Sequence, residues 1–524
     1  MGYRIVIPTA GTGSRLGSLT QFINKSLVSI AHRPTISHLI EKFPEDCEFV
    51  IALGYKGHLV REFLELAYPH RTFYFVDVEP FDGEGSGLGF SLLCCEQYLQ
   101  HPFIFLSCDT LVKEPVPPPD QNWMGFASLE DLSSYRTVSV NNKNVLKIHE
   151  KGDSRGSDHH AYIGLAGIKD YAEFWLAMHQ GGQTAMAQGE AYGLRALLKK
   201  KPLNGYPFTW FDTGTPSALE HARAAYREPH EPNILEKENE AIWFIGPRVV
   251  KFSDDTKFIE NRVRRAEILK GFSPEVIASR PHMYCYQKVA GEVLSGVVSL
   301  PLFQRFLRHC SGFWLKVNIT NDQTKRFVDT CRKFYHDKTR ERVELFYRNF
   351  DKQDGREHIN DETMPLLSSL LEQVDWDDLA KGLPGRFHGD FHFENILWNS
   401  RSETFTFLDW RQDFGGDLEV GDMYYDLAKL LHGLIVSHEL IAEDAFSVGW
   451  GKDSIRFDLH RKQVLVECEQ YFMVWCDENN FDRTKVRLLT ALIYLNIAAL
   501  HHYPYSLLLY SLGKRMLKHE LEKK

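Results

Sequence analysis

The segment Arg386–Leu397, with the sequence RFHGDFHFENIL, limits the possible fold and function of this chain more than any other segment. It is a predicted loop that holds polar residues at a characteristic spacing. Asp390 lies in the predicted loop, Asn395 follows after four intervening residues, and Asp409 ends the hydrophobic segment that comes next. Phosphoryl transfer needs this arrangement, since one carboxylate accepts the proton of a hydroxyl while an amide and a second carboxylate hold magnesium ions. The segment therefore predicts a kinase.

Composition limits what surrounds this loop. A chain of 524 residues exceeds what one hydrophobic core usually supports, so we expect at least two domains. The net charge of -9 argues against nucleic acid as a partner but not against nucleotides. Without a leader before Tyr3–Pro8 or an apolar run of ~18 residues, the sequence predicts a cytoplasmic protein that binds no membrane. The nine scattered cysteines form no zinc motif and predict reduced, buried thiols.

Alternating strands and helices are predicted in the first half. Hydrophobic segments at Arg4–Pro8, Phe49–Tyr55, Thr72–Val76 and Phe103–Asp109 favour strands, and His58–Ala67 has the period of an amphipathic helix. This order is typical of a doubly wound, mostly parallel sheet. In such sheets ligands bind at the carboxyl ends of the strands.

A loop rich in small residues, Thr9–Gly17, follows the first strand. Small residues let backbone N–H groups approach an anion, and Arg15 adds a positive charge. The glycine spacing matches neither the dinucleotide fingerprint nor a Walker loop. An ordinary strand-to-helix turn is the alternative interpretation.

Residues 3–227 resemble the sugar-nucleotide pyrophosphorylase-like nucleotidyltransferases. The resemblance rests on Gly11–Leu16, Lys25, the glycine-rich loop Gly83–Gly89, Asp109 and the segment Trp210–Pro216. The family joins a nucleoside triphosphate to a phosphorylated compound and releases pyrophosphate. This chain departs from the family beside its lysine, where Asn24 and Ser26 replace the usual prolines.

The resemblance implies roles for individual residues. Arg15 and Lys25 would grip the triphosphate and stabilise charge at the α-phosphate, while Asp109 and Asp212 would hold Mg2+. The implied nucleotide-binding residues are Ala10, Gly11, Thr12, Gly13, Gly85, Ser86 and Gly87. The pair Glu150 and Lys151 occupies the place of a family pair that touches the acceptor phosphate. Alternatively, Asp109 caps a helix and Asp212 is a turn residue.

A short linker is predicted at Glu228–Asn233, which holds two prolines and no apolar period. We therefore expect a nucleotidyltransferase-like domain at 1–228, a linker with the start of a kinase lobe at 229–240, and a kinase-like domain at 241–524. The predicted fold class is α/β, with the doubly wound sheet followed by a two-lobed α+β domain that has a large helical lobe.

A hairpin around Gly246–Pro247 is predicted to open the second domain. Lys251 ends its second strand, where a kinase places the lysine that holds the α- and β-phosphates. In the predicted helix Ile259–Lys270, either Glu260 or Glu267 could pair with this lysine. We favour Glu267, and a solvated helix face is the alternative. The next predicted strand leads into a hinge whose backbone at Tyr286 and Val289 could meet an adenine edge.

From Asn233 to Lys514 the chain resembles the aminoglycoside phosphotransferase and choline kinase family. The matching segments are the catalytic loop His388–Asn395, the strand Phe407–Trp410 and the helix start Gly421–Ala428. The resemblance assigns Asp390 as the base and Asn395 and Asp409 as Mg2+ ligands. It also assigns supporting structural roles to His388, Asp422 and Asp426, and no chemical role to His392.

The remainder of the second half is predicted to be helical, with helices at Met364–Val374, Val464–Val474 and Thr484–Leu500. Aromatic residues at Trp410, Tyr424 and Tyr503–Tyr505 are candidates for an acceptor pocket that could hold a quaternary ammonium group. The alternative interpretation is that they are core residues.

Together the two halves predict a sequence of reactions, because a kinase makes the kind of phosphate ester that a nucleotidyltransferase consumes. ATP would phosphorylate a small alcohol, and a second triphosphate, CTP by preference, would activate the product, with Mg2+ at both sites. This resembles bacterial phosphocholine-type pathways that decorate surface polysaccharides. One alternative is a sugar kinase acting at the anomeric hydroxyl, followed by a sugar-1-phosphate nucleotidyltransferase. Another is that one half is a catalytically inactive binding domain. The sequence leaves the acceptor, the base and the oligomeric state open.

Overall fold

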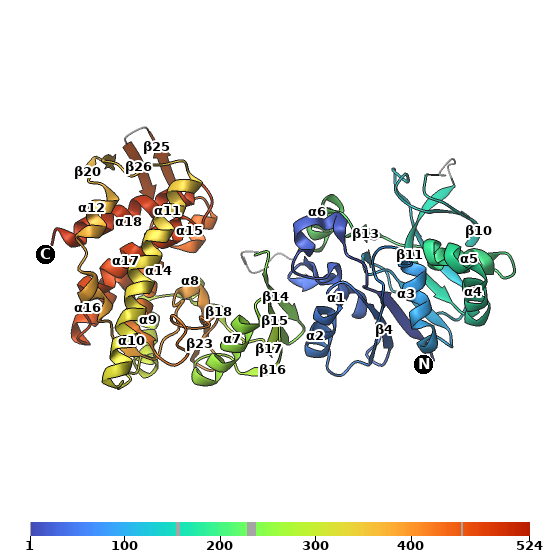
Figure 1. Cartoon of the computed structure of the whole chain (residues 1–524), viewed down its shortest axis with the longest axis horizontal. Coiled ribbons are helices and arrows are strands. Elements are labelled where there is room, and N and C mark those ends of the chain that lie inside the picture. The colour runs from blue at the N-terminus through green and yellow to red at the C-terminus, as the bar shows by residue number, and fades with distance from the viewer. Residues whose placement is uncertain (1, 153–157, 228–236, 452–453, 524) are drawn as a thin grey trace. The chain divides into compact units, whose positions relative to one another are not determined.

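The computed structural model describes residues 2–152, 158–227, 237–451 and 454–523 (Figure 1). Contacts divide the chain into two compact units. The first consists of Met1–Ile259 and Ile277–Lys288, and the second of Glu260–Val276 and Val289–Lys524. The predicted linker Glu228–Asn233 lies outside the described residues.

A nine-stranded sheet forms the centre of the first unit, with the order β5-β4-β1-β6-β11-β8-β12-β10-β9. The strands are β1 Arg4–Pro8, β4 Glu48–Leu53, β5 Phe73–Asp77, β6 Phe103–Leu106, β8 Trp123–Ala127, β9 Thr137–Asn141, β10 Asn144–His149, β11 His159–Ile168 and β12 Asn204–Pro207. Strands β5, β4, β1 and β6 are mutually parallel, as the sequence predicts, and β11 runs antiparallel to β6 and β8. The parallel half therefore directs four strand ends toward one edge.

Both faces of this sheet are covered. Ile5 and Ile7 of β1 belong to one buried cluster and Val6 to the other, which is the alternation that a strand imposes on its side chains. The covering helices are α1 Thr35–Ile40, α2 Gly57–Ala67, α3 Leu88–Cys95, α4 Tyr171–Gln188, α5 Glu190–Leu198 and α6 Pro216–Tyr226, with 3-10 turns η1 Ser14–Thr20, η2 Lys25–Leu27 and η3 Glu96–Tyr98. Two short ladders, β2 Ser29–Ile30 with β3 Arg33–Pro34 and β7 Thr110–Val112 with β13 Trp210–Asp212, complete this part.

A second sheet packs against α2 within the same unit. Its strands are β14 Glu240–Ile245, β15 Arg248–Ser253, β17 Met283–Gln287 and β16 Val276–Arg280, in that order. Trp243 is fully buried, its ring centroid lies 5.1 Å from that of Phe63, and its Nε1 donates to Ser29 Oγ at 2.9 Å. The predicted hairpin is confirmed, but contacts group it with the first unit, whereas the sequence expects it to open the second domain. The predicted domain boundaries stay a prediction.

The second unit is mainly helical. Its helices are α7 Thr256–Ile268 (from Glu260 onward), α8 Leu294–Val297, α9 Leu300–Phe313, α10 Asn321–Arg332, α11 Lys338–Asn349, α12 Leu367–Glu372, α13 Trp376–Ala380, α14 Met423–Ile435, α15 His438–Ala442, α16 Gln463–Glu478, α17 Arg483–Ala498 and α18 Tyr505–Leu521, with the π-helical turn η4 Lys333–Asp337 and the 3-10 turn η5 Phe393–Asn395. The predicted helices at 364–374, 464–474 and 484–500 correspond to α12, α16 and α17, with shifted ends. The fold class predicted for the whole chain is confirmed.

Three small sheets interrupt these helices. They consist of β18 Glu292–Val293, β22 Ile396–Asn399 and β23 Thr404–Phe407; of β20 Glu362–Met364, β19 Glu357–Ile359, β26 Ser454–Leu459 and β25 Phe446–Trp450; and of β21 Pro384–Gly385 with β24 Gly421–Asp422. The expectation that the remainder is helical is therefore wrong for the segments that form the four-stranded sheet. Those strands have at most six residues, too few for a clear period in the sequence.

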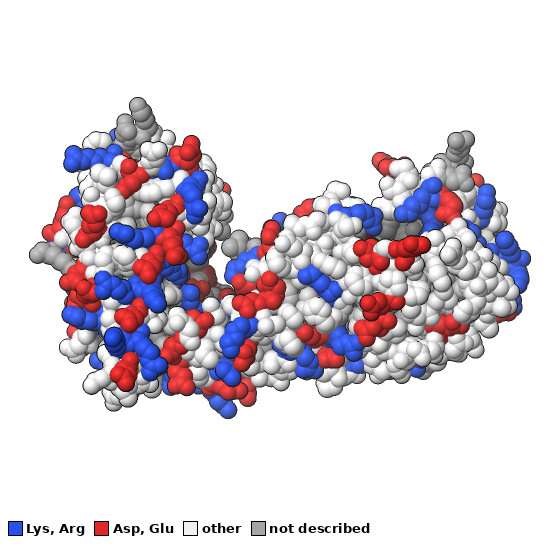
Figure 2. All heavy atoms as spheres, viewed as in Figure 1, with Lys and Arg blue, Asp and Glu red and all other residues white. Residues whose placement is uncertain are grey.

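The cysteines, the possible membrane-spanning helices and the surface charge bear on what the composition predicts. All nine cysteines are free, and eight of them are buried, as predicted. Within the part of the chain that the structure describes, no helix has the length and apolar character to cross a bilayer. Figure 2 shows Lys and Arg interspersed with Asp and Glu on the drawn face of the second unit.

Candidate active sites

The first candidate site centres on a partly buried ion pair between Lys25 and Asp109. Lys25 begins η2, Asp109 follows β6, and Lys25 Nζ lies 3.1 Å from Asp109 Oδ2. Ser107 Oγ donates to Asp109 Oδ1 at 2.6 Å. Burial by itself raises the pKa of Asp109, but the Lys25 ammonium and the Ser107 hydroxyl outweigh it and hold the pKa at about 2. The opposite balance applies to Lys25, where burial lowers the pKa and Asp109 raises it by more. Both side chains are therefore charged at neutral pH.

Arg15 and Asp212 converge on the same place. Strand β13 pairs with β7, so Asp212 is opposite Thr110 and one residue from the register of Asp109. A β-carbon built on Gly214 would lie 3.1 Å from Asp212 Oδ1, 3.2 Å from Arg15 Nη2 and 3.5 Å from Asp109 Oδ2. The absence of a side chain at Gly214 thus leaves room where one cationic and two acidic side chains meet.

The chemistry of these donors fits a divalent cation. Burial raises the pKa of Asp212, the neighbouring Asp109 carboxylate raises it further, and the Gly214 N–H that donates to Asp212 at 2.8 Å opposes the shift. Two carboxylates that repel each other in a partly buried place form the ligand set that Mg2+ prefers. The convergence agrees with the predicted metal roles of Asp109 and Asp212, which stay predictions.

Asn24 fixes the loop that carries Lys25, although this loop lacks the prolines that flank the lysine in the nucleotidyltransferase family that the first half resembles. Its fully buried Nδ2 donates to Thr9 O at 2.9 Å and to Tyr55 O at 2.6 Å, and its Oδ1 accepts from Ser26 N at 2.9 Å and Ser26 Oγ at 2.8 Å. Side-chain hydrogen bonds therefore link the Lys25 loop to the ends of β1 and β4. In the sequence Asn24 is visible only as a departure from the family, and this role was not predicted.

The two loops predicted to bind nucleotide lie at strand and helix ends, as expected. Ala10 follows β1 and accepts a hydrogen bond from Tyr55 N at 2.9 Å, and Gly11–Gly13 continue from it toward η1. Gly85 and Gly87 have φ angles of 83° and 145°, which disfavour residues with a β-carbon, and they precede α3. Their roles, and that of Ser86 between them, stay predictions.

The predicted acceptor pair has partners that the sequence did not identify. Glu150 contacts Arg195 Nη1 at 2.7 Å and Arg136 Nε at 3.3 Å, and Lys151 is exposed. Burial raises the pKa of Glu150, but Arg195 and Arg136 outweigh it, so the pKa is lowered. Because these arginines are 14 residues before and 45 residues after Glu150, sequence spacing offered no signal for them. The acceptor role of the pair stays a prediction.

The second candidate site surrounds Asp390 in the loop between β21 and β22. Lys429 Nζ of α14 lies 2.8 Å from Asp390 Oδ1, and Asn395 Nδ2 donates to Asp390 Oδ2 at 3.1 Å. His392 Nε2 is 3.4 Å from the same oxygen. Burial raises the pKa of Asp390, but Lys429 and His392 outweigh it and hold the pKa well below its usual range. Asp390 is therefore an ionised carboxylate near the predicted metal ligand Asn395.

Lys429 is not among the residues predicted from the sequence, although its spacing offers a signal. Asp422, Asp426 and Lys429 are spaced four and three residues apart, which places them on one face of α14. Asp426 accepts hydrogen bonds from His388 N at 2.6 Å and Gly389 N at 2.7 Å. Asp422 caps α14 by accepting from Tyr424 N at 3.0 Å. The predicted supporting roles of these two aspartates are borne out, and the same helix face supplies the cation for Asp390.

Asp409 contacts α7. Its φ angle is 56°, a left-handed conformation that is unusual outside glycine, and its Oδ1 accepts from Arg262 Nη1 at 2.8 Å. Trp410 is 1% exposed, and its Nε1 donates to Arg262 O at 2.9 Å. Trp410 is thus a core residue, so its inclusion among the pocket candidates is wrong, and the alternative interpretation holds for it. Tyr424 is also buried, and its hydroxyl accepts from Asp482 N at 3.0 Å.

Lys251 and the other residues predicted to bind ATP are divided between the two units. Lys251 lies on β15 and Tyr286 on β17 of the first unit, whereas Glu267 on α7 and Val289 belong to the second. Glu267 is exposed, and Glu260 forms an ion pair with Arg264 of the same helix at 3.3 Å. The pairing of Lys251 with a glutamate, and the adenine contact, stay predictions.

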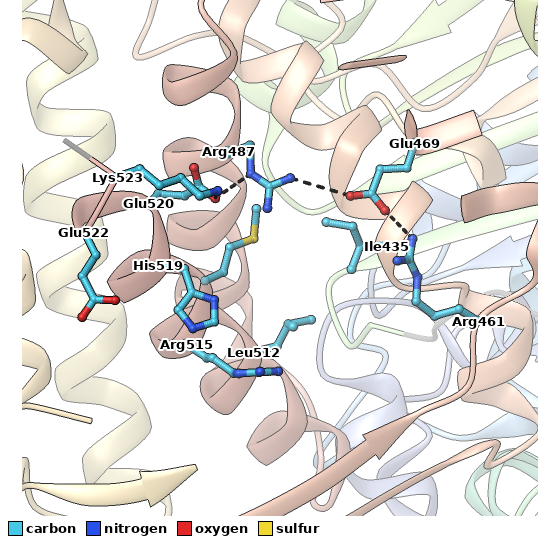
Figure 3. A pocket seen from close by; sticks show the side chains of 11 residues that line it. Ile435, Arg461, Glu469, Arg487, Leu512, Arg515, His519, Glu520, Glu522 and Lys523 are labelled. Carbon is cyan, nitrogen blue, oxygen red and sulfur yellow. Dashed lines mark hydrogen bonds and ion pairs between the residues drawn. The ribbon is translucent and has the colours of Figure 1, made fainter. Parts of the chain in front are cut away.

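A separate pocket in the second unit contains none of the predicted site residues (Figure 3). Its lining residues include charged side chains from α16, α17 and α18. Arg487 Nε lies 2.6 Å from Glu520, and Arg461 lies 2.6 Å from Glu469. Arg515 lies 2.5 Å from Glu362, a residue that Figure 3 does not draw. The pocket is therefore surrounded by a network of ion pairs.

Comparison with known proteins finds matches in both halves. The sequence model of the phosphotransferase enzyme family matches residues 328–458, which include the Asp390 loop. A 150-residue stretch is 23% identical to the bifunctional protein GlmU of Methanococcus vannielii, covering 28% of this chain and 34% of that protein. The chain thus matches about a third of the length of that relative. The predicted resemblances of the two halves are confirmed.

Solved structures similar to this chain include two nucleotidyltransferases. A putative glucose-1-phosphate thymidylyltransferase from Bacillus anthracis has a TM-score of 0.38 and 18% identity, and the similarity covers 45% of this chain and 98% of that one. The CTP:phosphocholine cytidylyltransferase from Streptococcus pneumoniae has a TM-score of 0.36 and 14% identity, with coverage of 43% and 100%.

Proposed function

We propose that this chain is a bifunctional enzyme that phosphorylates a small alcohol with ATP and then transfers a nucleotidyl group, by preference from CTP, to the phosphoester. One observation carries the proposal: each half contains a partly buried aspartate that a lysine holds ionised, Asp109 by Lys25 and Asp390 by Lys429, beside further Mg2+-type ligands. A single chain with two such centres suits two successive reactions of polyphosphates. The product would be an activated donor for surface polysaccharide or related glycoconjugate synthesis.

In the kinase reaction, Asp390 would orient the acceptor hydroxyl and accept its proton as the oxygen attacks the γ-phosphate of ATP. Lys429 keeps the carboxylate ionised, so that it is ready to act as a base at neutral pH. Asn395 and Asp409 would hold Mg2+, which supplies neutralisation of phosphate charge. Asp426 positions the loop through its hydrogen bonds with the His388 and Gly389 amides.

In the nucleotidyl transfer, the new phosphoester would attack the α-phosphate of the second triphosphate, and pyrophosphate would leave. Arg15 and Lys25 offset the negative charge that accumulates when two polyanions meet. Asp109 and Asp212 would hold Mg2+, which supplies further charge neutralisation. Asn24 positions Lys25 through the hydrogen bonds of its loop.

The alternative in which the first half is a catalytically inactive binding domain is less well supported. The replacement of family prolines by Asn24 and Ser26 first suggested it. The side chains of Arg15, Asp109 and Asp212 nevertheless converge, and Asn24 and Ser26 hydrogen-bond to each other beside Lys25. The alternative with a sugar as acceptor keeps both chemistries, so the same assay distinguishes it.

The test uses the full chain with Mg2+, ATP, each of the four common nucleoside triphosphates in turn, and a panel of amino alcohols, polyols and sugars. Mass spectrometry of the products names the acceptor and the base together. We expect ADP to form with one class of acceptor and pyrophosphate to appear only when acceptor, ATP and the second nucleotide are all present. Pyrophosphate release that needs no kinase product, or ADP formation that is never followed by a nucleotide-linked product, would contradict the proposal.

A further inference from the structure

Three side chains beside the kinase loop have the arrangement of a metal site that the proposed reaction does not use. They are His392 and Glu394 in the catalytic loop and His438 at the start of α15. Glu394 Oε2 lies 2.9 Å from His392 Nδ1 and 3.6 Å from His438 Nδ1, and the three ligand atoms all lie within 4.8 Å of one another. The sequence alone predicts no chemical role for His392 and no zinc motif.

The spacing suits tetrahedral coordination. With bonds of ~2.0–2.1 Å, neighbouring ligand atoms on a tetrahedral zinc ion are separated by roughly 3.3 Å, which lies between the two distances to Glu394. Two imidazoles and one carboxylate form a ligand set typical of zinc, whereas Mg2+ prefers oxygen ligands alone. The site therefore differs in chemistry from the predicted Mg2+ ligands Asn395 and Asp409.

A third histidine, His432, lies next to this group. The ring centroid of His432 is 5.9 Å from that of His438, and the side chain is 2% exposed. Among the described residues neither ring nitrogen of His432 has a hydrogen-bond partner, which is costly for a buried polar group. Gly433, the next residue, brings α14 close to the loop, because a β-carbon there would lie 3.3 Å from His392 Cβ. The helix thus adds an unpartnered imidazole beside the three candidate ligands.

The second nitrogen of His392 also has the partner that metal-binding histidines usually have. Its Nε2 lies 3.4 Å from Asp390 Oδ2 and 3.2 Å from Asn395 Nδ2, while Nδ1 faces Glu394. A carboxylate on the far side of an imidazole fixes the ring and makes it a better ligand. We propose that His392, Glu394 and His438 bind a zinc ion, which ties the catalytic loop to α15. The binding claim stands independently of the proposed function, and only its relevance to catalysis rests on the assignment of Asp390.

The experiment measures Zn2+ binding to the full chain after chelator treatment, by calorimetry with a competing chelator and with excess Mg2+ to occupy oxygen-ligand sites. The variants His438→Ala and Glu394→Gln each remove one ligand. The control His179→Ala removes a histidine whose Nε2 lies 2.8 Å from Glu96 but which belongs to no three-ligand group among the described residues. Circular dichroism checks that each variant is folded.

We expect the unmodified chain and His179→Ala to bind one Zn2+ that both ligand variants lose, with Kd weakened by ~100-fold or more. Added Zn2+ should raise the thermal midpoint of the unmodified chain but not that of His438→Ala. Co2+ in place of Zn2+ should give the intense visible absorption of tetrahedral coordination, absent from the variants. Equal Zn2+ stoichiometry and Kd in all four proteins would overturn the inference. Because no substrate is present, loss of binding in the variants supports the site even if the proposed kinase activity fails.

Discussion

In both candidate sites a lysine keeps an aspartate ionised, but the two lysines lie on different kinds of structural element. In each, burial disfavours an ionised aspartate, and a lysine at 3.1 Å or 2.8 Å reverses that effect. In the first unit, Lys25 is on a short turn that Asn24 fastens to two strand ends. In the second, Lys429 is on the long helix α14, one turn after the aspartate that braces the loop. The position of Lys25, on a loop, thus depends on neighbouring side chains, whereas the position of Lys429, on a helix, depends on the helical backbone.

The largest expected effect tests whether the two sites are independent. Replacing Asp390 by Asn removes the base but keeps the size of the side chain, so ADP formation should fall by ~10²–10⁴-fold. Formation of the nucleotide-linked product from supplied phosphoester should remain, because Asp390 belongs to the other unit. Product formation from each substrate is measured by mass spectrometry. Equal loss of both activities would contradict independent sites.

Lys25→Met should give the reverse pattern. Without the ammonium group, charge at the α-phosphate loses one stabilising partner, and Asp109 loses its counterion, so nucleotidyl transfer should fall by ~10²–10³-fold. ADP formation should be unchanged. Pyrophosphate release and ADP formation are measured in parallel, and Lys200→Met, at an exposed position, is the matched control. Retained pyrophosphate release in Lys25→Met would remove Lys25 from the site.

Many features of the two sites could be predicted from the sequence, because local sequence patterns determine the strands and loops that carry them. Buried parallel strands have continuous apolar segments, so β1, β4, β5 and β6 were predicted, and their carboxyl ends necessarily place Asp109 near the first loop. The Asp390 loop of the second unit has fixed spacing between Asp390 and Asn395, so the sequence alone predicts a base and a metal ligand there.

What the sequence did not reveal depends on contacts between distant segments. Trp243 packs on Phe63 from 180 residues away, and nothing in the period of either segment specifies that partner. The apolar face of the hairpin was therefore predicted, but not the surface that covers it. His438 approaches Glu394 across 44 residues for the same reason. Lys429 is different, since its helical spacing from Asp426 was visible.

Lys429→Met sharpens the comparison by removing the helix-borne lysine. The Asp390 carboxylate would lose its closest cation, so its pKa should rise from a value that is now well below the usual range. Because the base acts in its ionised form, the acidic limb of the pH profile for ADP formation should move to higher pH. At neutral pH the carboxylate stays ionised, and we expect a decrease of ~10–100-fold because Asp390 loses the contact that fixes its position. This decrease is smaller than for Asp390→Asn, because the base itself remains. An unchanged acidic limb would show that Lys429 does not control the ionisation of Asp390.

Asn24→Ala should have the smallest effect on activity and a measurable effect on stability. The change leaves the carbonyl groups of Thr9, which is buried, and Tyr55, which is partly buried, without the amide that now donates to them. This loss costs ~1–3 kcal/mol in the free energy of unfolding. Lys25 would keep its charge but lose the fixed position of its loop, so nucleotidyl transfer should fall by less than in Lys25→Met. Chemical denaturation and pyrophosphate release measure the two effects, with Asn144→Ala at an exposed position as the control. A loss of stability without any loss of transfer would mean that the loop position of Lys25 does not depend on Asn24, and the contrast between loop-borne and helix-borne lysines would fail.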